Sequence, residues 1–238
     1  MKMRCNVENN NIKKTKNLSF NLYKRAAFLI IQLLFGLGIC LISTGDIIYL
    51  GAWILAGLFL VTYVIFFFIL PKDVKENRAN KDANKALYEK VLVIPMYLFG
   101  YGTYVIAGLD QRFGWSTDIP LYMLILAIFI FAIGMLITGW SMRENPYFSK
   151  MQTAEDHPII TSGPYQIIRH PGYLGMMTYL SVVPIILESL YAMLPTLLVI
   201  LLFIIRTYME DLYLRTHSTA YQKYAAEVKH KLFRSYKS

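Results

Sequence analysis

Residues 119–142 read IPLYMLILAIFIFAIGMLITGWSM, a run of 24 positions without a charged side chain. A helix needs about 20 consecutive apolar residues to cross the hydrocarbon core of a bilayer. Five further apolar runs accompany this one, at residues 26–44, 47–70, 91–109, 173–187 and 191–209. The run at 173–187 is short and contains Pro184, so we expect it to be tilted, kinked or re-entrant. The sequence therefore predicts an all-α, polytopic transmembrane protein with about six spans, five of them full length.

The basic residues are distributed unevenly around these runs. All but one of the 24 Lys and Arg residues lie before residue 26, in the 71–90 loop, in the loop after residue 142, or from Arg206 onward. Arg112 is the exception. Because Lys and Arg are retained on the cytoplasmic side, we expect the termini and the loop after residue 142 to be cytoplasmic. The net charge of +9 then suits anionic membrane lipids and requires no nucleic acid.

The chain divides into three parts by composition. Residues 1–25 form a basic cytoplasmic tail, and residues 26–90 form a transmembrane hairpin with a charged loop, which we interpret as scaffold. Residues 91–238 contain the groups capable of chemistry. Cys5 lies in the tail and Cys40 in the first apolar run, so neither a disulfide nor a metal site is expected from them.

Residues 145–175 form a dense polar and turn-forming cluster. It contains Asn145-Pro-Tyr-Phe-Ser149, Gly163-Pro-Tyr165 and Arg169-His-Pro-Gly-Tyr-Leu-Gly175. Its prolines disfavour helix, so we expect a folded, non-helical cap at the cytoplasmic end of the spans. Such a backbone needs protein or a wet cavity to satisfy its polar groups. We expect an aromatic-lined cavity suited to a cation or an adenine, formed by Tyr147, Phe148, Tyr165, His170 and Tyr173. The alternative is an interfacial loop in which Arg169 or His170 contacts lipid phosphate.

A second cluster ends the last apolar run. Arg206 and Glu210 are four residues apart, which places them on one face of a helix, and Asp211 follows directly. Ionisable groups are costly within a span and commonly mark functional sites. Two carboxylates beside one arginine leave an unmatched negative charge, suited to a cationic cofactor, a ribose diol or an amine. The alternative is that Arg206 pairs with Glu210 and extends toward the membrane surface.

Taken together, the two clusters resemble the integral-membrane S-adenosylmethionine-dependent methyltransferases related to isoprenylcysteine carboxyl methyltransferase and to phospholipid N-methyltransferases. The resemblance spans about residues 120–228 and includes Tyr221 and Tyr224 beyond the two clusters. It implies that residues 91–238 form a methyltransferase core with a cytoplasmic-side catalytic cap. The cofactor site would lie in residues 145–175 and 206–228.

The resemblance also implies roles for individual residues. Arg206 and Glu210 would be catalytic, and the substrate would contact Asn145, Arg169 and Arg206. The S-adenosyl-L-methionine site would comprise Gly163, Pro164, Tyr165, His170, Tyr173, Gly175, Glu210, Asp211, Tyr221 and Tyr224. The segments 216–218 and 229–233 depart from the pattern of the family.

Methyl transfer from a sulfonium is an in-line displacement that depends on alignment and a dry site. No metal is expected, because the four histidines lack ligand-like spacing with Cys or carboxylates. Arg206 would hold a carboxylate acceptor, while Glu210 would orient the substrate or accept a proton from an amine. The acceptor would be lipophilic and would enter from the bilayer. Its identity stays open between a prenylated cysteine carboxylate, a phospholipid amine, a quinone-like or isoprenoid thiol or alcohol, and a small hydrophobic molecule.

Two other functions fit parts of the sequence. A membrane sterol or enone reductase using NADPH carries a similar Arg-His…Tyr-x-Gly string, but Gly172 and Met176 differ from the flanking residues usual there. A small transporter would place charged or broken helices near the middle of the membrane, whereas the polar residues here lie at one face.

Overall fold

The computed structural model describes residues 23–24, 26–71, 74, 87–148 and 158–232, and in these ranges the regular structure is helical. The predicted tail at residues 1–25 and most of the predicted 71–90 loop lie outside this part of the chain. The first helix spans Ala26–Thr44. It is followed by α2 (Leu50–Ile69), α4 (Leu87–Phe113) and α5 (Leu121–Glu144). Five of the helices so described, including α8 (Met193–His217), are long and apolar enough to cross a membrane, which confirms the predicted fold class.

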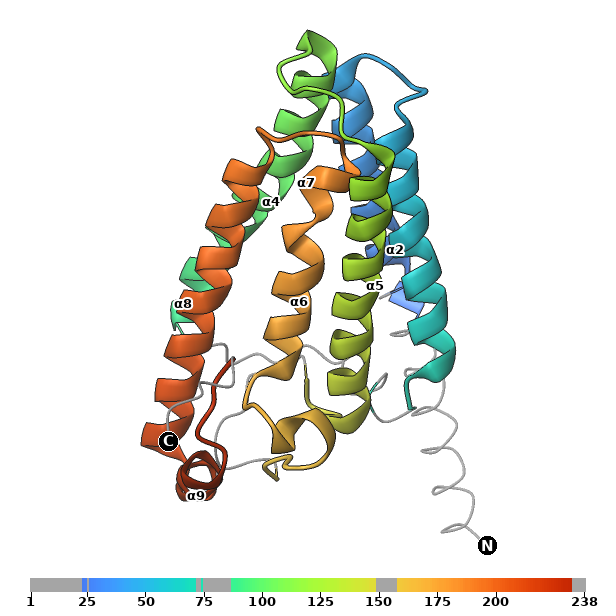
Figure 1. Ribbon diagram of the computed structural model, residues 1–238. Coiled ribbons are helices and arrows are strands. Elements are labelled where there is room, and N and C mark those ends of the chain that lie inside the picture. The colour runs from blue at the N-terminus through green and yellow to red at the C-terminus, as the bar shows by residue number, and fades with distance from the viewer. Residues whose placement is uncertain (1–22, 25, 72–73, 75–86, 149–157, 233–238) are drawn as a thin grey trace, which may run out of the picture.

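The predicted span at residues 173–187 is shorter than the others and is divided into two helices. It consists of α6 (Pro171–Ser181) and α7 (Val183–Ile186), which meet at Val182. Pro184 has no N–H to donate, and its ring cannot fit against the carbonyl of the preceding turn, so the helix kinks there as expected. Figure 1 shows α6 and α7 as one rod between α5 and α8.

Two glycines allow α5 and α6 to pack closely. A Cβ atom at Gly175 would lie 2.4 Å from Thr138 Oγ1, and one at Gly134 would lie 2.5 Å from the backbone nitrogen of Tyr179. Both distances are shorter than any side chain tolerates, so only glycine permits this approach. The contact holds the first turns of α6 against the end of α5 and thereby positions the polar cluster.

One end of the bundle is closed by a hydrogen-bonded network around Asp110, at the end of α4. The Asp110 carboxylate accepts bonds from the Ser116 backbone N–H (2.7 Å) and hydroxyl (2.5 Å). The Ser189 hydroxyl, in the loop before α8, donates to the same carboxylate. These bonds tie the loop between α4 and α5 to the loop before α8. The opposite end carries the polar cluster, η1 (Gly163–Gln166) and α9 (Thr219–Glu227).

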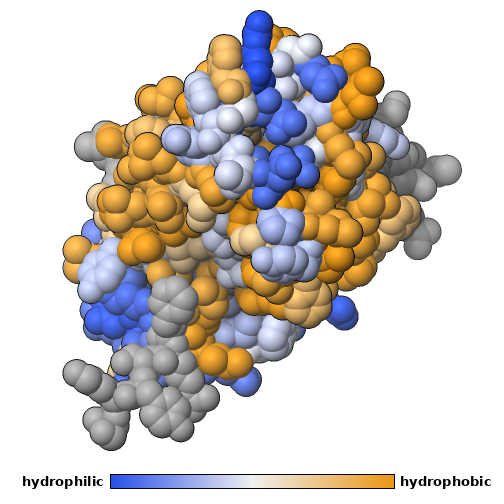
Figure 2. All heavy atoms as spheres, turned by 45° about the horizontal axis from the view of Figure 1, so that its top comes forward, coloured by the Kyte–Doolittle hydropathy of each residue, from blue (hydrophilic) through white to orange (hydrophobic). Residues whose placement is uncertain are grey.

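The flanks of the bundle are apolar. Large hydrophobic side chains on several helices are exposed, among them Phe68, Leu136, Leu194 and Leu212. Figure 2 shows this apolar surface along the sides of the bundle, with hydrophilic residues gathered toward an end. Because exposing so much apolar surface to water is unfavourable, the surface indicates contact with the hydrocarbon of a bilayer.

Candidate active site

A cavity lies where α5 ends and α6 begins, and α8 and α9 close its other side. The five aromatic residues expected to surround it, Tyr147, Phe148, Tyr165, His170 and Tyr173, all line it. The remaining lining residues are Asn145, Ile159, Ile160, Arg169, Gly172, Glu210, Leu214, Tyr221 and Tyr224. The sequence thus predicted an aromatic cavity correctly. In its described residues, 145–148 and 158–170, the cap contains only the short 3-10 helix η1 (Gly163–Gln166), as expected for a largely non-helical segment, and α6 already begins at Pro171. Residues 149–157 of the predicted cap lie outside the described part of the chain.

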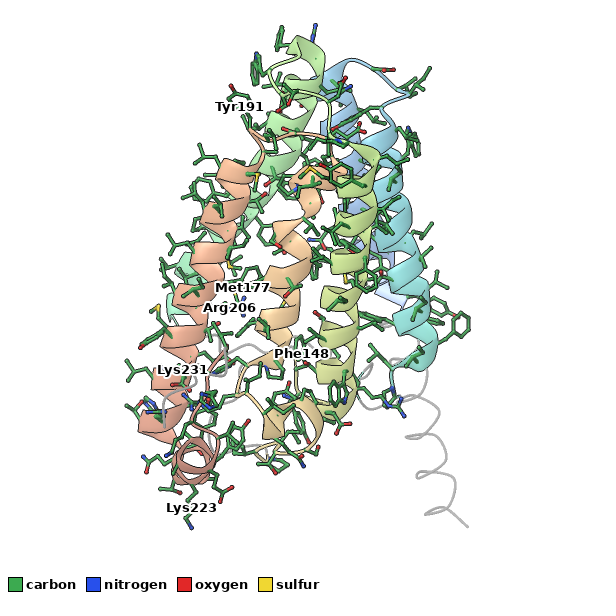
Figure 3. The ribbon with its side chains drawn as sticks, in the orientation of Figure 1. Phe148, Met177, Tyr191, Arg206, Lys223 and Lys231 are labelled. Atoms are coloured by element: carbon green, nitrogen blue, oxygen red, sulfur yellow. The ribbon has the colours of Figure 1, made fainter. Side chains whose placement is uncertain are left out.

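Tyr173 and Glu210 join α6 to α8 inside this cavity. The Tyr173 hydroxyl donates to Glu210 Oε2 at 2.5 Å. The His170 ring stacks on Tyr173 with centroids 5.9 Å apart, and the Arg206 guanidinium lies 5.5 Å from the centre of the Tyr173 ring. Figure 3 shows Arg206 between α8 and α6. Tyr173 therefore links the carboxylate, the imidazole and the guanidinium.

Asp211 faces away from the cavity and is 1% exposed. Its carboxylate accepts from Arg169 Nε (2.7 Å) and Nη2 (3.2 Å) and from the Tyr221 hydroxyl (2.9 Å). Arg215 Nε and Lys231 Nζ each lie 3.3 Å from Oδ2, and His170 Nε2 lies 3.6 Å from Oδ1. The idea that Asp211 adds an unmatched negative charge is therefore wrong, because cations surround it.

The segment after α9 is hydrogen-bonded to the stretch of chain just before α6. The backbone N–H groups of Arg169 and His170 donate to the carbonyls of His230 (2.9 Å) and Lys231 (3.0 Å). Arg169 Nη1 also donates to the Val228 carbonyl at 2.6 Å. These three bonds satisfy polar groups in the non-helical stretch before α6 and hold the last described residues against Arg169 and His170.

Three buried tyrosines complete the wall. The Tyr224 hydroxyl donates to the Tyr165 carbonyl at 2.6 Å, which joins α9 to η1. Burial raises the pKa of Tyr165, Tyr221 and Tyr224, and for Tyr221 the nearby Asp211 charge raises the pKa further. Their hydroxyls consequently stay protonated and remain hydrogen-bond donors at neutral pH.

The predicted site residues fall into two groups. Eight of them line the cavity: Asn145, Tyr165, Arg169, His170, Tyr173, Glu210, Tyr221 and Tyr224. The structure places five others outside its lining: Gly163, Pro164, Gly175, Arg206 and Asp211.

Four of those five have a structural reason for their identity or position. Gly163 has a φ of 58°, and a Cβ there would lie 2.6 Å from Glu144 Cγ, so the turn into η1 requires glycine. Pro164 is buried in the first turn of η1. Gly175 serves the contact between α5 and α6, and Asp211 serves the charge network. Their predicted contacts with a cofactor stay predictions.

Sequence reasoning missed four lining residues, Ile159, Ile160, Gly172 and Leu214. Ile159 and Ile160 follow Pro158 and supply an apolar wall, but an isoleucine pair in a loop gives no chemical signal. Gly172 lies under Phe148, and a Cβ there would fall 2.0 Å from Phe148 Cε2. The close contact of that ring with the backbone could be read only from the fold.

Comparison with known proteins agrees with this arrangement. Residues 123–216 match the isoprenylcysteine carboxyl methyltransferase (ICMT) family. The chain is also 32% identical over 72 residues to Protein-S-isoprenylcysteine O-methyltransferase B of Arabidopsis thaliana, across 30% of this chain and 34% of that protein. The alignment thus spans about a third of the relative's length. The segment that matches the ICMT family includes α6, Tyr173 and Glu210.

Proposed function

We propose that the protein transfers a methyl group from S-adenosyl-L-methionine to a lipophilic acceptor at the cytoplasmic face of a membrane. The observation that carries the proposal is the aromatic cavity in which Tyr173 holds the carboxylate of Glu210. The similarity to the ICMT family supports the reaction class, since the cavity lies largely within the matched residues 123–216.

The lining fits the chemistry of this cofactor. Aromatic faces attract cations, and a carboxylate adds a negative charge beside them. The nearby Arg169 is matched by Asp211 and so does not oppose a positive ligand. Bound there, S-adenosylmethionine supplies an electrophilic methyl group on a positively charged sulfur.

The protein's own residues would bind, orient and exclude water. Arg206 is suited to hold an acceptor carboxylate, because a guanidinium pairs with it through two parallel hydrogen bonds. Glu210 would orient the donor or, with an amine acceptor, accept the released proton. The tyrosines and isoleucines of the lining keep water from the reacting atoms.

The cavity is small in this structure. Its volume is about 80 Å³, below the roughly 150 Å³ of an engineered cavity that accommodates benzene. A ligand the size of a nucleoside therefore enters only when part of the wall moves outward. Binding should accordingly be accompanied by a change in conformation of the cap.

The name of the relative directs the choice of acceptor. That protein is an S-isoprenylcysteine O-methyltransferase, and an oxygen nucleophile agrees with Arg206 as the group that holds a carboxylate. We propose an isoprenylcysteine-type carboxylate as the acceptor, with a lipid amine or thiol as the alternative. The cytoplasmic placement rests on the basic residues near the cavity end, among them Arg143, Arg215, Lys223 and Lys229.

Calorimetric titration in mild detergent tests the proposal. Purified protein is titrated with S-adenosylhomocysteine and, separately, with NADPH. Saturable binding of S-adenosylhomocysteine alone is expected, followed by transfer of labelled methyl groups to an S-prenylated cysteine. Binding of NADPH alone would favour a reductase, and folded protein that binds neither would contradict both enzymatic functions.

A further inference from the structure

Positive charge exceeds negative charge around the buried Asp211 carboxylate. Arg169 holds this carboxylate through two hydrogen bonds and is itself buried, so the two charges cancel. Arg215 Nε and Lys231 Nζ also lie 3.3 Å from Asp211 Oδ2. Within the described ranges, Asp211 is the only carboxylate that pairs with Arg215 or Lys231. Three cations therefore face one carboxylate, which leaves a surplus of two positive charges.

The two surplus cations come from different segments and converge on one atom. Arg215 belongs to α8, whereas Lys231 follows α9, and both approach Oδ2 of Asp211. Their nitrogens consequently lie no farther apart than twice 3.3 Å, a separation that the oxygens of one phosphate group can bridge. Lys231 Nζ also lies 3.4 Å from the centre of the Tyr208 ring, which holds it against α8. Figure 3 shows Lys231 beside α8, above α9.

Both cations remain accessible from outside the protein. The Arg215 side chain is 44% exposed and the Lys231 side chain is 27% exposed. A guanidinium has five N–H donors and an ammonium has three, more than the Asp211 carboxylate uses. The pair can therefore bind an anion while it keeps its contacts with Asp211.

The position of the pair along α8 matches the headgroup region of a bilayer. The 25 residues of α8, at about 1.5 Å each, extend beyond the roughly 30 Å of the hydrocarbon core, so the last turns leave it. Tyr208 and Leu212 lie on the same face of the helix as Arg215, since they precede it at intervals of three and four residues. Both are 63% exposed on the flank of the bundle. Apolar surface therefore leads directly to the two cations.

We propose that Arg215 and Lys231 bind the phosphate of an anionic phospholipid in the leaflet at the cavity end, with the acyl chains along Tyr208 and Leu212. Guanidinium and ammonium groups form strong, charge-assisted hydrogen bonds with phosphate, and basic residues at this level attract anionic headgroups. A soluble phosphate would match the charge but would leave the adjoining apolar face uncovered.

This lipid site is separate from the active-site cavity. In the described part of the chain, the lining of that cavity includes neither Arg215 nor Lys231. The lipid is therefore a ligand and not the methyl acceptor, and the inference stands independently of the proposed function. Because Lys231 belongs to the segment that is hydrogen-bonded to Arg169 and His170, a shared phosphate would hold this segment to α8. A ligand that binds only the folded state stabilises it, so anionic lipid should raise the melting temperature.

Native mass spectrometry of the detergent-solubilised protein tests the inference, with phosphatidylglycerol and phosphatidylcholine of identical acyl chains as probes. We expect the wild type to bind phosphatidylglycerol about tenfold more tightly than phosphatidylcholine. Arg215→Gln and Lys231→Gln should each reduce that preference about fivefold. Lys223→Gln, which removes a charge from exposed α9 at the same end, should keep the preference. So should Lys231→Arg, which retains the charge.

The results that would overturn the inference are specific. They are a wild type without preference for phosphatidylglycerol, an unchanged preference in both Arg215→Gln and Lys231→Gln, and an equal loss in Lys223→Gln, which would indicate general surface charge. Inorganic phosphate provides a further arm. If it raises the melting temperature as much as phosphatidylglycerol does, the site takes a free anion and the lipid assignment is wrong. Thermal unfolding in phosphatidylcholine micelles shows that each variant is folded, and Lys231→Gln alone decides if Arg215→Gln is not.

Discussion

At the scale of single residues, Glu210 and Asp211 are neighbours with different surroundings. Successive residues on a helix point about 100° apart, so Glu210 lines the cavity while Asp211 faces Arg169, Tyr221 and the C-terminal segment. We infer that Glu210 serves the ligand and that Asp211 serves the fold. Substitution of Glu210 should therefore affect ligand binding, whereas substitution of Asp211 should affect stability.

Replacing Glu210 by Gln keeps the size of the side chain and removes its charge. Loss of a charged partner should weaken S-adenosylhomocysteine binding by about 1.5–3 kcal/mol, or ten-fold to a hundred-fold. Calorimetry measures the change, with Glu227→Gln on exposed α9 as the control for a lost surface carboxylate. Equal affinities for Glu210→Gln and wild type would remove Glu210 from the cofactor site.

Replacing Asp211 by Asn leaves Arg169, which is 3% exposed, without its buried counter-charge. Breaking a buried ion pair from one side costs about 3–5 kcal/mol, so the free energy of unfolding should fall by that order. Thermal unfolding of the solubilised protein reports this, beside Asp118→Asn in an exposed loop. An unchanged melting temperature for Asp211→Asn would show that the charge network contributes no stability.

At the scale of elements, the contact between α5 and α6 determines where the cavity lies. Gly175→Ala would place a methyl group 2.4 Å from Thr138 Oγ1. The strain of such overpacking is typically about 1–3 kcal/mol, and α6 would shift away from α5. Gly57→Ala on α2 is the matched control, because nothing lies within 4 Å of its Cβ position. The prediction fails if both alanine variants melt at the same temperature.

Helices could be predicted from the sequence more reliably than their contacts. Long apolar runs such as residues 119–142 predict a span through their length and composition alone, and Pro184 predicted the kink. The apolar run at 191–209 predicted the last span, and α8, which contains most of this run, continues to His217. Local composition signals where hydrocarbon ends and does not signal where helical hydrogen bonding ends.

In the candidate site, too, residue types could be predicted from the sequence, whereas packing contacts could not. His170, Tyr173 and Glu210 could be predicted to line the cavity because they belong to two clusters of polar, ionisable and turn-forming residues in a chain that is 56% hydrophobic. Gly163 and Gly175 were assigned to the cofactor because a glycine in a motif looks the same whether it admits a ligand or a neighbouring helix. Only the packing distances distinguish these two reasons.

At the scale of the whole molecule, the six apolar segments run in alternating directions, so that one end of the bundle carries the cavity and the other the Asp110 network. The distribution of basic residues predicts that the cavity end is cytoplasmic. Figure 3 shows Lys223 projecting from that end, with Tyr191 at the opposite end.

Single cysteines introduced at Glu227 and Asp118, in a background with Cys5 and Cys40 replaced, test this orientation. A membrane-impermeant maleimide should label the Asp118→Cys protein in right-side-out vesicles and the Glu227→Cys protein only in inside-out vesicles. Detergent-solubilised samples provide the control for intrinsic reactivity. The reverse labelling pattern would place the cavity on the outer face.

The hydrogen bonds from Arg169 and His170 to residues 230 and 231 have a consequence for biosynthesis. A ribosome delivers α5 and α6 to the membrane well before it makes those partners. During that interval the N–H groups of Arg169 and His170, and one edge of the Asp211 carboxylate, remain open to water. The bonds that hold the stretch before α6 therefore form only after residues 228–231 have been synthesised and have folded back against it.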